Sequence, residues 1–288
     1  MLKKLVLLLL VMLLSVSTFN CIYASEVQTD SSPFYEEKGQ VIFDSVKLTN
    51  ENGRIEIQKS TNIEQSQKLS QKLDDPDIQD ILSKYMGEGK TPVAIGWTKV
   101  YLKDSKDPNN KTGVVPMTIE DVERLSGNIA NPNAASGTPT VKGNFTLYTL
   151  VGYDNYDPTA LYAESIGKWN GGQYGSNGPA NDNDDFMTIT WPNGYVLTSS
   201  TIFGDCSGPY KKDEAYSSVV WGFGEESGEI ILASNGRNDS SSGTRKWVSK
   251  YVHTWAETVP SFNFSLTDVG ITLTNSSASW QIASSLIY

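Results

Sequence analysis

Residues alternate between two faces along most of the second half of the chain, from Lys142 to Tyr288. A period of two is typical of β-strands, because successive side chains of a strand point to opposite faces of a sheet. Turn-forming residues separate these segments, so the pattern predicts a mainly β protein, built as an antiparallel β-sandwich or a partly open barrel. The clearest sets at this spacing are Phe145/Leu147/Thr149, Met187/Ile189/Trp191, Val219/Trp221/Phe223 and Phe262/Phe264/Leu266.

One connection carries a strong hairpin signal. The pair Asn193-Gly194 supplies the two positive-φ residues of a tight type I′ turn. Such a turn predicts that the flanking strands pair directly, with Trp191 opposite Val196.

Helical spacing is clear only in the first half of the chain. Within residues 61–86, four apolar residues recur at intervals of three and four, which predicts an amphipathic helix: Ile78, Ile81, Leu82 and Tyr85. Asp75 and Pro76 are typical first residues of a helix, and Gly87 is a typical last one. A shorter helix is predicted over residues 119–126, where Thr118 and Asp121 form a capping pair.

The residues before the β-rich second half of the chain are predicted to form a small α+β unit. Val41-Ile42-Phe43 and Ile55-Glu56-Ile57 flank a turn at residues 50–53, which predicts that they pair as a hairpin. The predicted organisation is a hairpin-plus-helix region at 39–90 followed by the β-sandwich at 91–288. The boundary lies in the Gly- and Pro-containing residues 87–92, and a single domain is the alternative.

The first residues resemble a secretory signal. Lys3 and Lys4 precede ten apolar residues at 5–14, and Ala24 is a small residue before a predicted cleavage site. An apolar core of this length is too short to span a bilayer, which disfavours a membrane anchor. Lipid attachment at Cys21 is also disfavoured, because Phe19 and Asn20 depart from the usual lipoprotein pattern. We expect a signal peptide at 1–24, a flexible leader at 25–38 and a secreted, extracellular, bacterial protein with no stable membrane span afterwards.

Charge and cysteine content narrow the range of partners. The net charge is −10, and it becomes −12 when Lys3 and Lys4 are removed with the signal. A surface this acidic repels phosphate backbones and anionic lipids, so we expect no nucleic-acid partner. Only Cys206 remains after cleavage, so an internal disulfide is excluded.

The surroundings of Cys206 resemble a protease motif over six residues. Residues 204–209 read Gly-Asp-Cys-Ser-Gly-Pro, which is similar to the nucleophile loop of chymotrypsin-like proteases with cysteine in place of serine. The resemblance ends there, because the one histidine, His253, lies 47 residues downstream instead of upstream. One interpretation is a Cys206 nucleophile with His253 as base and Asp205 or a nearby Asn as orienting group. The other is a cysteine and a histidine with structural roles.

Oxygen donors are densest at residues 181–185. Asn181, Asn183 and Asp185 occupy alternate positions, and Asp154 from another loop completes a candidate Ca²⁺ site. Phe186 stands where an EF-hand requires glycine, so an EF-hand is excluded. The alternative is a polar turn stabilised by local hydrogen bonds. No cofactor is required by the sequence, and Ca²⁺ is the one metal ion it favours.

Residues 247–255 carry four aromatic rings at odd positions and two valines, Val248 and Val252, at even positions. Trp247, Tyr251 and Trp255, with His253, share one face of the predicted strand. If this face is exposed, the three large rings form a platform that stacks on sugars. If it faces inward, the rings are part of the core.

These features favour a secreted, non-catalytic binding protein that recognises a glycan or a cell surface through Trp247, Tyr251 and Trp255. The first alternative is a cysteine-dependent hydrolase using Cys206 and His253. The second is a β-rich pore-forming or antagonistic toxin, because residues 265–285 alternate Ser and Thr with apolar residues as membrane-inserting hairpins do. The absence of catalytic spacing disfavours an enzyme.

Overall fold

The structure is a computed structural model that describes residues 33–43, 46–51, 53–60, 69–108, 110, 113–130, 139–157, 159–170, 185–192, 195–203, 207–213, 218–223, 227–234, 246–255, 260–264, 269–273 and 279–287. The predicted signal at 1–24 lies outside these residues. In the predicted leader, strand begins at Glu36, so its last three residues are β structure. None of the helices in the described ranges has the length and apolar character needed to cross a membrane.

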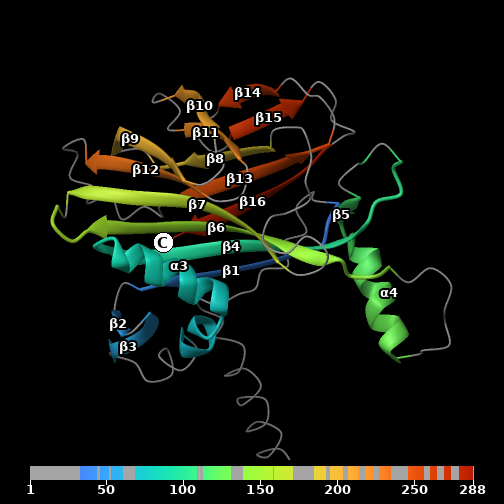
Figure 1. Cartoon of the computed structure of the whole chain (residues 1–288), viewed down its shortest axis with the longest axis horizontal. Helices are drawn as coiled ribbons and strands as arrows, with labels where there is room; N and C mark the ends of the chain where they lie inside the picture. The colour runs from blue at the N-terminus through green and yellow to red at the C-terminus, as the bar shows by residue number, and fades with distance from the viewer. Residues whose placement is uncertain are drawn as a thin grey trace, which may run out of the picture.

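Two antiparallel sheets form the body of the molecule (Figure 1). The larger contains, in spatial order, β1 (Glu36–Ile42), β4 (Lys90–Asp104), β6 (Gly143–Asp154), β7 (Ala160–Asn170), β12 (Ser227–Ser234) and β9 (Tyr195–Phe203), with β5 (Val114–Pro116) beside β4. The smaller contains β10 (Ser207–Asp213), β11 (Ser218–Phe223), β8 (Asp185–Thr190), β13 (Lys246–Thr254) and β16 (Ser279–Ile287). The prediction of a mainly β, antiparallel protein is confirmed, and the described strands form stacked sheets with no closed barrel.

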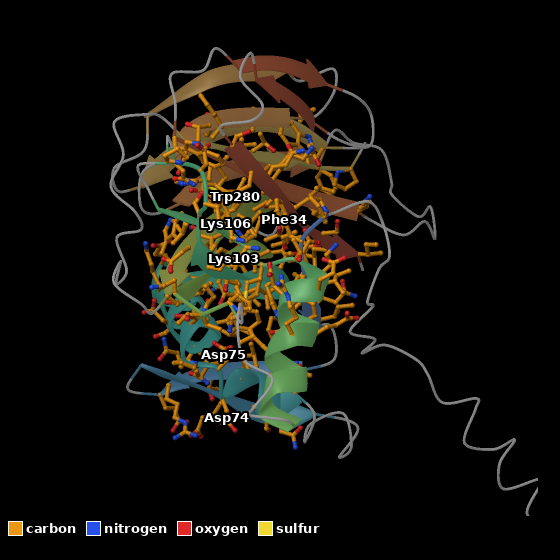
Figure 2. The ribbon with its side chains drawn as sticks, turned by 90° about the vertical axis from the view of Figure 1, so that its right-hand side faces the viewer. Phe34, Asp74, Asp75, Lys103, Lys106 and Trp280 are labelled. Carbon is orange, nitrogen blue, oxygen red and sulfur yellow. The ribbon has the colours of Figure 1, made fainter. Side chains whose placement is uncertain are left out.

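The remaining elements are two separate hairpins and two helices. The hairpins pair β2 (Val46–Glu51) with β3 (Arg54–Ser60), and β14 (Pro260–Phe264) with β15 (Val269–Leu273). The helices are α3 (Pro76–Gly87), preceded by a helical turn at 69–73, and α4 (Ile119–Ala130). Figure 2 shows the layers from the side: the smaller sheet, the larger sheet, and then α3 with the β2–β3 hairpin.

Aromatic side chains fill the space between the two sheets. The Phe145 ring of the larger sheet stacks on the Tyr251 ring of the smaller one, with centroids 4.3 Å apart. Trp169 lies 4.8 Å from the same Phe145 ring, and Trp280 lies 5.8 Å from it. Aromatic pairs at such distances contribute about 0.5–1.5 kcal/mol each beyond the area that they bury. These rings therefore join strands from both sheets into one core.

A second core lies on the other face of the larger sheet. Ile78, Leu82 and Tyr85 of α3 are buried against this face together with Ile95 of β4. A side chain at Gly152 of β6 would collide with the Tyr85 ring, so glycine is needed for the helix to pack this closely. The three apolar helix residues are among those predicted from the helical spacing.

The ends of both helices follow the predicted chemistry. The Asp75 carboxylate accepts the backbone N–H groups of Asp77 and Ile78 at 2.9 and 3.3 Å, and Pro76 begins α3. Thr118 and Asp121 exchange hydrogen bonds at the start of α4, where the Asp121 carboxylate also pairs with Lys103 of β4. The helix continues to Ala130, four residues beyond the predicted end.

Strand pairing differs from the prediction near the start of the chain. Val41 and Ile42 lie in β1, which pairs with β4 of the larger sheet, and Ile55 pairs instead with Asn50 in the β2–β3 hairpin. The 39–90 region thus contributes residues of β1 to the larger sheet, and β4 begins at Lys90. Val41 gains a larger apolar surface against α3 than a two-stranded hairpin offers.

The hairpin predicted around Asn193-Gly194 is absent among the described strands. β8 pairs with β11 and β13, whereas β9 pairs with β12 in the other sheet. The connection therefore passes from one sheet to the other, and Trp191 and Leu197 are both buried in the core between them. Burial of these two side chains between the sheets outweighs direct pairing of β8 with β9, and residues 193–194 themselves lie outside the described ranges.

Candidate functional site

The three aromatic residues predicted as a sugar platform lie inside the molecule. Trp247 and Tyr251 are 0% exposed and Trp255 is 6% exposed. The valines on the opposite face of β13, Val248 and Val252, are also buried. Both faces of this strand are thus covered, and the structure shows the inward-facing alternative. These rings pack in the core and offer no open surface for stacking.

His253 lies in a buried polar group with Asp185 and Tyr251. Its Nδ1 atom is 2.8 Å from the Asp185 carboxylate, which also accepts the Tyr251 hydroxyl and, at 2.8 Å, the Thr254 N–H. Burial and the neighbouring Asp185 charge raise the pKa of Tyr251 well above its ordinary value, so its hydroxyl stays protonated. The group joins the start of β8 to the end of β13.

The topology separates His253 from the strand that follows Cys206. Cys206 lies outside the described residues, and β10 begins at Ser207. Two strands, β11 and β8, lie between β10 and β13. With neighbouring strands about 4.8 Å apart, β10 and β13 are separated by roughly 14 Å. The described partner of His253 is instead Asp185, which the sequence had indicated only as a calcium ligand.

The residues predicted to bind calcium have separate surroundings where they are described. Asn181 and Asn183 lie outside the described residues. Asp185 belongs to the buried group, and Asp154, the last residue of β6, accepts the N–H of Tyr156 at 2.6 Å and the hydroxyl of Tyr162 at 3.1 Å. Within the described ranges, no three His, Cys, Asp or Glu side chains lie close enough together to hold a metal ion.

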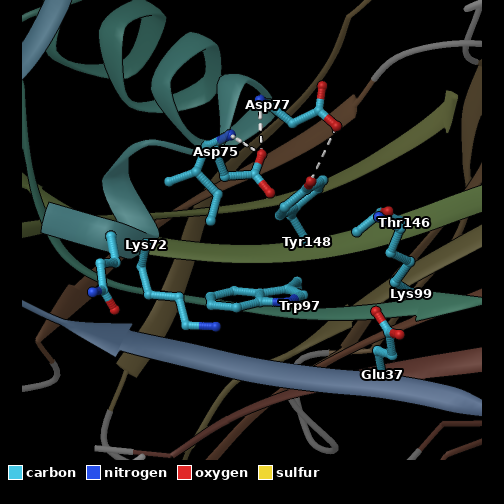
Figure 3. Close-up of a pocket in the computed structure, with 10 residues that line it drawn as sticks. Glu37, Lys72, Asp75, Asp77, Trp97, Lys99, Thr146 and Tyr148 are labelled. Carbon is cyan, nitrogen blue, oxygen red and sulfur yellow. Dashed lines mark hydrogen bonds between the residues drawn. The ribbon is translucent and has the colours of Figure 1, made fainter. Parts of the chain in front are cut away.

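A pocket lies between the start of α3 and the face of the larger sheet on which α3 packs (Figure 3). Its volume is about 230 Å³. Strands β1, β4 and β6 form one side, while α3 and the residues just before it form the other. The lining residues are Glu37, Gln71, Lys72, Asp75, Asp77, Ile78, Trp97, Lys99, Thr146 and Tyr148.

Trp97 is the main apolar surface of this pocket. It is partly exposed, and its strand neighbour in the β4–β6 register is Tyr148. On the β1 side its neighbour is Gly39, where an added Cβ would lie 2.2 Å from the indole. The indole can therefore lie against the β1 backbone because residue 39 has no side chain. The Lys72 ammonium is 5.4 Å from the ring centroid.

Asp77, one of the carboxylates that line the pocket with Trp97, is held by three neighbouring side chains. Asp77 accepts the Asn170 side-chain amide at 2.7 Å, approaches the Tyr148 hydroxyl at 3.5 Å and pairs with Lys168 at 3.7 Å. Burial, followed by the charges of Asp77 and Asp75, raises the pKa of Tyr148, so the hydroxyl remains a donor.

Across the pocket, Glu37 accepts the Tyr101 hydroxyl at 3.0 Å. Burial and the Glu37 charge raise the pKa of Tyr101 to about 12, so this hydroxyl also remains a donor.

Sequence reasoning did not identify this pocket. Asp75 was recognised only as a helix cap, and Glu37 was placed in a flexible leader. Trp97 and Tyr148 come from segments about fifty residues apart, and they become neighbours only through the pairing of β4 with β6. The sequence offered one signal, a tryptophan at an alternating strand position, and the surroundings of this residue depend on the register.

Comparisons with protein-family models, curated proteins and solved structures gave no match. The chemistry of the described residues is therefore the basis for assigning a function.

Proposed function

We propose that this protein is exported and acts outside the cell as a non-catalytic binding protein that recognises a glycan in the pocket beside α3. The observation that carries the proposal is the partly exposed indole of Trp97, held flat against β1 and ringed by polar side chains. The lysine-tipped apolar leader and Ala24 support export.

The pocket has the two kinds of surface that a sugar requires. The flat apolar face of an indole matches the C–H face of a pyranose ring. Thr146, Lys99 and Glu37 provide donors and acceptors at the edge of that face for sugar hydroxyl groups. Ligand sites of this kind are concave and mostly preformed, with a few polar groups that set orientation.

A binding role is favoured over hydrolysis because the nearest carboxylates already have structural tasks. Asp75 caps α3, and Asp77 is hydrogen-bonded to Asn170 and paired with Lys168. Glycosidases need two carboxylates that face the scissile bond and are free to exchange protons or attack.

The test is titration calorimetry of the purified protein against a panel of soluble oligosaccharides. Trp97→Ala should weaken binding by roughly tenfold or more, as truncation of a central aromatic contact does. Tyr156→Ala is the matched control, because this ring is 92% exposed outside the pocket. Equal binding by wild type and Trp97→Ala would place the site elsewhere. Mass spectrometry of the exported product should show cleavage after Ala24.

A further inference from the structure

The pocket already contains a cation over its aromatic face. Lys72 is exposed and lies on the helical turn at 69–73, and its ammonium is 5.4 Å from the centre of the Trp97 ring. Within the described part of the chain, this ammonium forms no ion pair with a carboxylate. A cation over an indole is attracted by the negative ring face. A long, exposed side chain held only by this contact can move away at low cost.

The charges near the indole favour a second cation once Lys72 has moved. Glu37, Asp75 and Asp77 line the pocket, and Lys99 is the other lining cation. The Lys99 ammonium lies 5.6 Å from the centroid of the Tyr101 ring, which does not line the pocket. Lys168 also pairs with Asp77 at 3.7 Å, so displacement of Lys72 leaves three carboxylates against two cations, with one negative charge in excess.

We propose that the glycan bound in this pocket carries a free amino group, and that Lys72 occupies the position of that ammonium when the pocket is empty. The inference rests on the proposed function, because it specifies the ligand of the same site. In the bound state the ligand ammonium lies over Trp97 or beside the carboxylates, and a sugar ring covers the rest of the indole. The raised pKa of Tyr148, caused in part by Asp77 and Asp75, reflects the same negative potential.

Other sugar classes fit these charges less well. An acidic sugar would place its carboxylate among three others, and like charges at such distances repel. A neutral or N-acetylated sugar can stack on Trp97 but gains nothing from the carboxylates. A pocket for a neutral sugar also gives no reason for a lysine placed over its stacking surface.

The experiment compares two tetrasaccharides that differ only at nitrogen: the β-1,4-linked glucosamine tetramer and its fully N-acetylated form. Calorimetry with the full exported chain at mildly acidic pH should show binding about tenfold tighter for the free amine, the size expected of a cation over an indole. Lys72→Ala should strengthen binding of the free amine about threefold, because it removes the internal competitor. The gain for the N-acetylated form should be smaller, because that ligand has no ammonium to attract to the carboxylates. Lys47→Ala, an exposed lysine on β2, is the control for net charge.

Each alternative outcome has a distinct meaning. Equal binding of both tetramers that is lost in Trp97→Ala would overturn the amino-sugar inference and leave the proposed function standing. Weaker binding of the free amine by Lys72→Ala would also overturn it, because Lys72 would then contact the ligand. Binding of the amine that survives Trp97→Ala would identify attraction to the acidic surface and overturn both. Failure of the free-amine tetramer to bind overturns the inference, and failure of the whole oligosaccharide panel overturns the proposed function as well.

Discussion

Gln40 and Ile287 form a closed pair of hydrogen bonds across the sandwich. The Gln40 side-chain amide donates to the Ile287 carbonyl at 3.1 Å and accepts the Ile287 N–H at 3.1 Å. Gln40 belongs to β1 of the larger sheet, and Ile287 is the last residue of β16 in the smaller sheet. The amide therefore takes the place of a neighbouring strand at this end of β16.

Loss of this pair should lower stability modestly. Gln40→Ala removes two hydrogen bonds at an exposed position, so we expect the free energy of unfolding to fall by about 1–2 kcal/mol. Urea denaturation followed by far-ultraviolet circular dichroism measures the change. Gln281→Ala, an exposed glutamine on the same β16 strand, should have little effect. Equal losses in both variants would show that the Gln40 contact is not specific.

Gly39 should control the position of the Trp97 indole. Gly39→Ala places a methyl group within 2.2 Å of the indole, so the ring must move. We expect a stability loss of about 1–3 kcal/mol from overpacking, together with weaker ligand binding. Gly87→Ala is the control, because Gly87 is the last residue of α3 and nothing lies within 4 Å of a Cβ added there. An unchanged tryptophan emission spectrum and full binding in Gly39→Ala would contradict the prediction.

The Asp185 carboxylate should contribute more to the free energy of unfolding than the Tyr251 hydroxyl does. Asp185→Ala leaves the Tyr251 hydroxyl, the Thr254 N–H and His253 without their shared acceptor, so we expect a loss of about 3–5 kcal/mol. Tyr251→Phe removes one donor and keeps the ring, and should cost about 1 kcal/mol. Chemical denaturation of both variants gives the comparison. Similar losses in the two would show that Asp185 serves Tyr251 alone.

The contacts that Asp121 makes with Lys103 and Thr118 at the start of α4 should weaken in acid. Burial pushes the pKa of Asp121 upward, but bonds from Lys103 and Thr118 outweigh it and lower the pKa below 3.8. A lowered pKa adds stability that is complete above 3.8 and is lost as the pH falls through the native value. Asp121→Asn should therefore lower the free energy of unfolding at neutral pH, and the difference from wild type should shrink below pH 3.8. Asp74→Asn, an exposed control, should show a smaller difference throughout.

Local signals predicted the helices well and the strand partners poorly. Asp75, Pro76 and the spacing of Ile78 and Leu82 act within one or two helical turns, so the sequence contains all that they require. Alternation locates strands, but it does not choose the inward face when both faces are buried. In β13 both Trp247 and Val248 are covered, so only the complete sandwich decides which set lies between the sheets.

The pocket could not be predicted because its residues come together through long-range pairing. The Trp97–Tyr148 contact depends on the β4–β6 register, and Glu37 joins them through the β1–β4 register. Lys72 and Asp75 reach the same place only when α3 docks on the sheet. The predicted pairing of Trp191 with Val196 was wrong for a related reason, since burial of Trp191 between the two sheets depends on strands distant in the sequence.

The Gln40–Ile287 pair also has a consequence for how the polypeptide acquires its native state. These residues are 247 positions apart, and β16 supplies Trp280, Ile282 and Leu286 to the interior between the sheets. A growing chain therefore lacks part of its central packing until β16 has been synthesised. Contacts at such long sequence separation slow folding, so the polypeptide should reach its native form in milliseconds to seconds rather than microseconds.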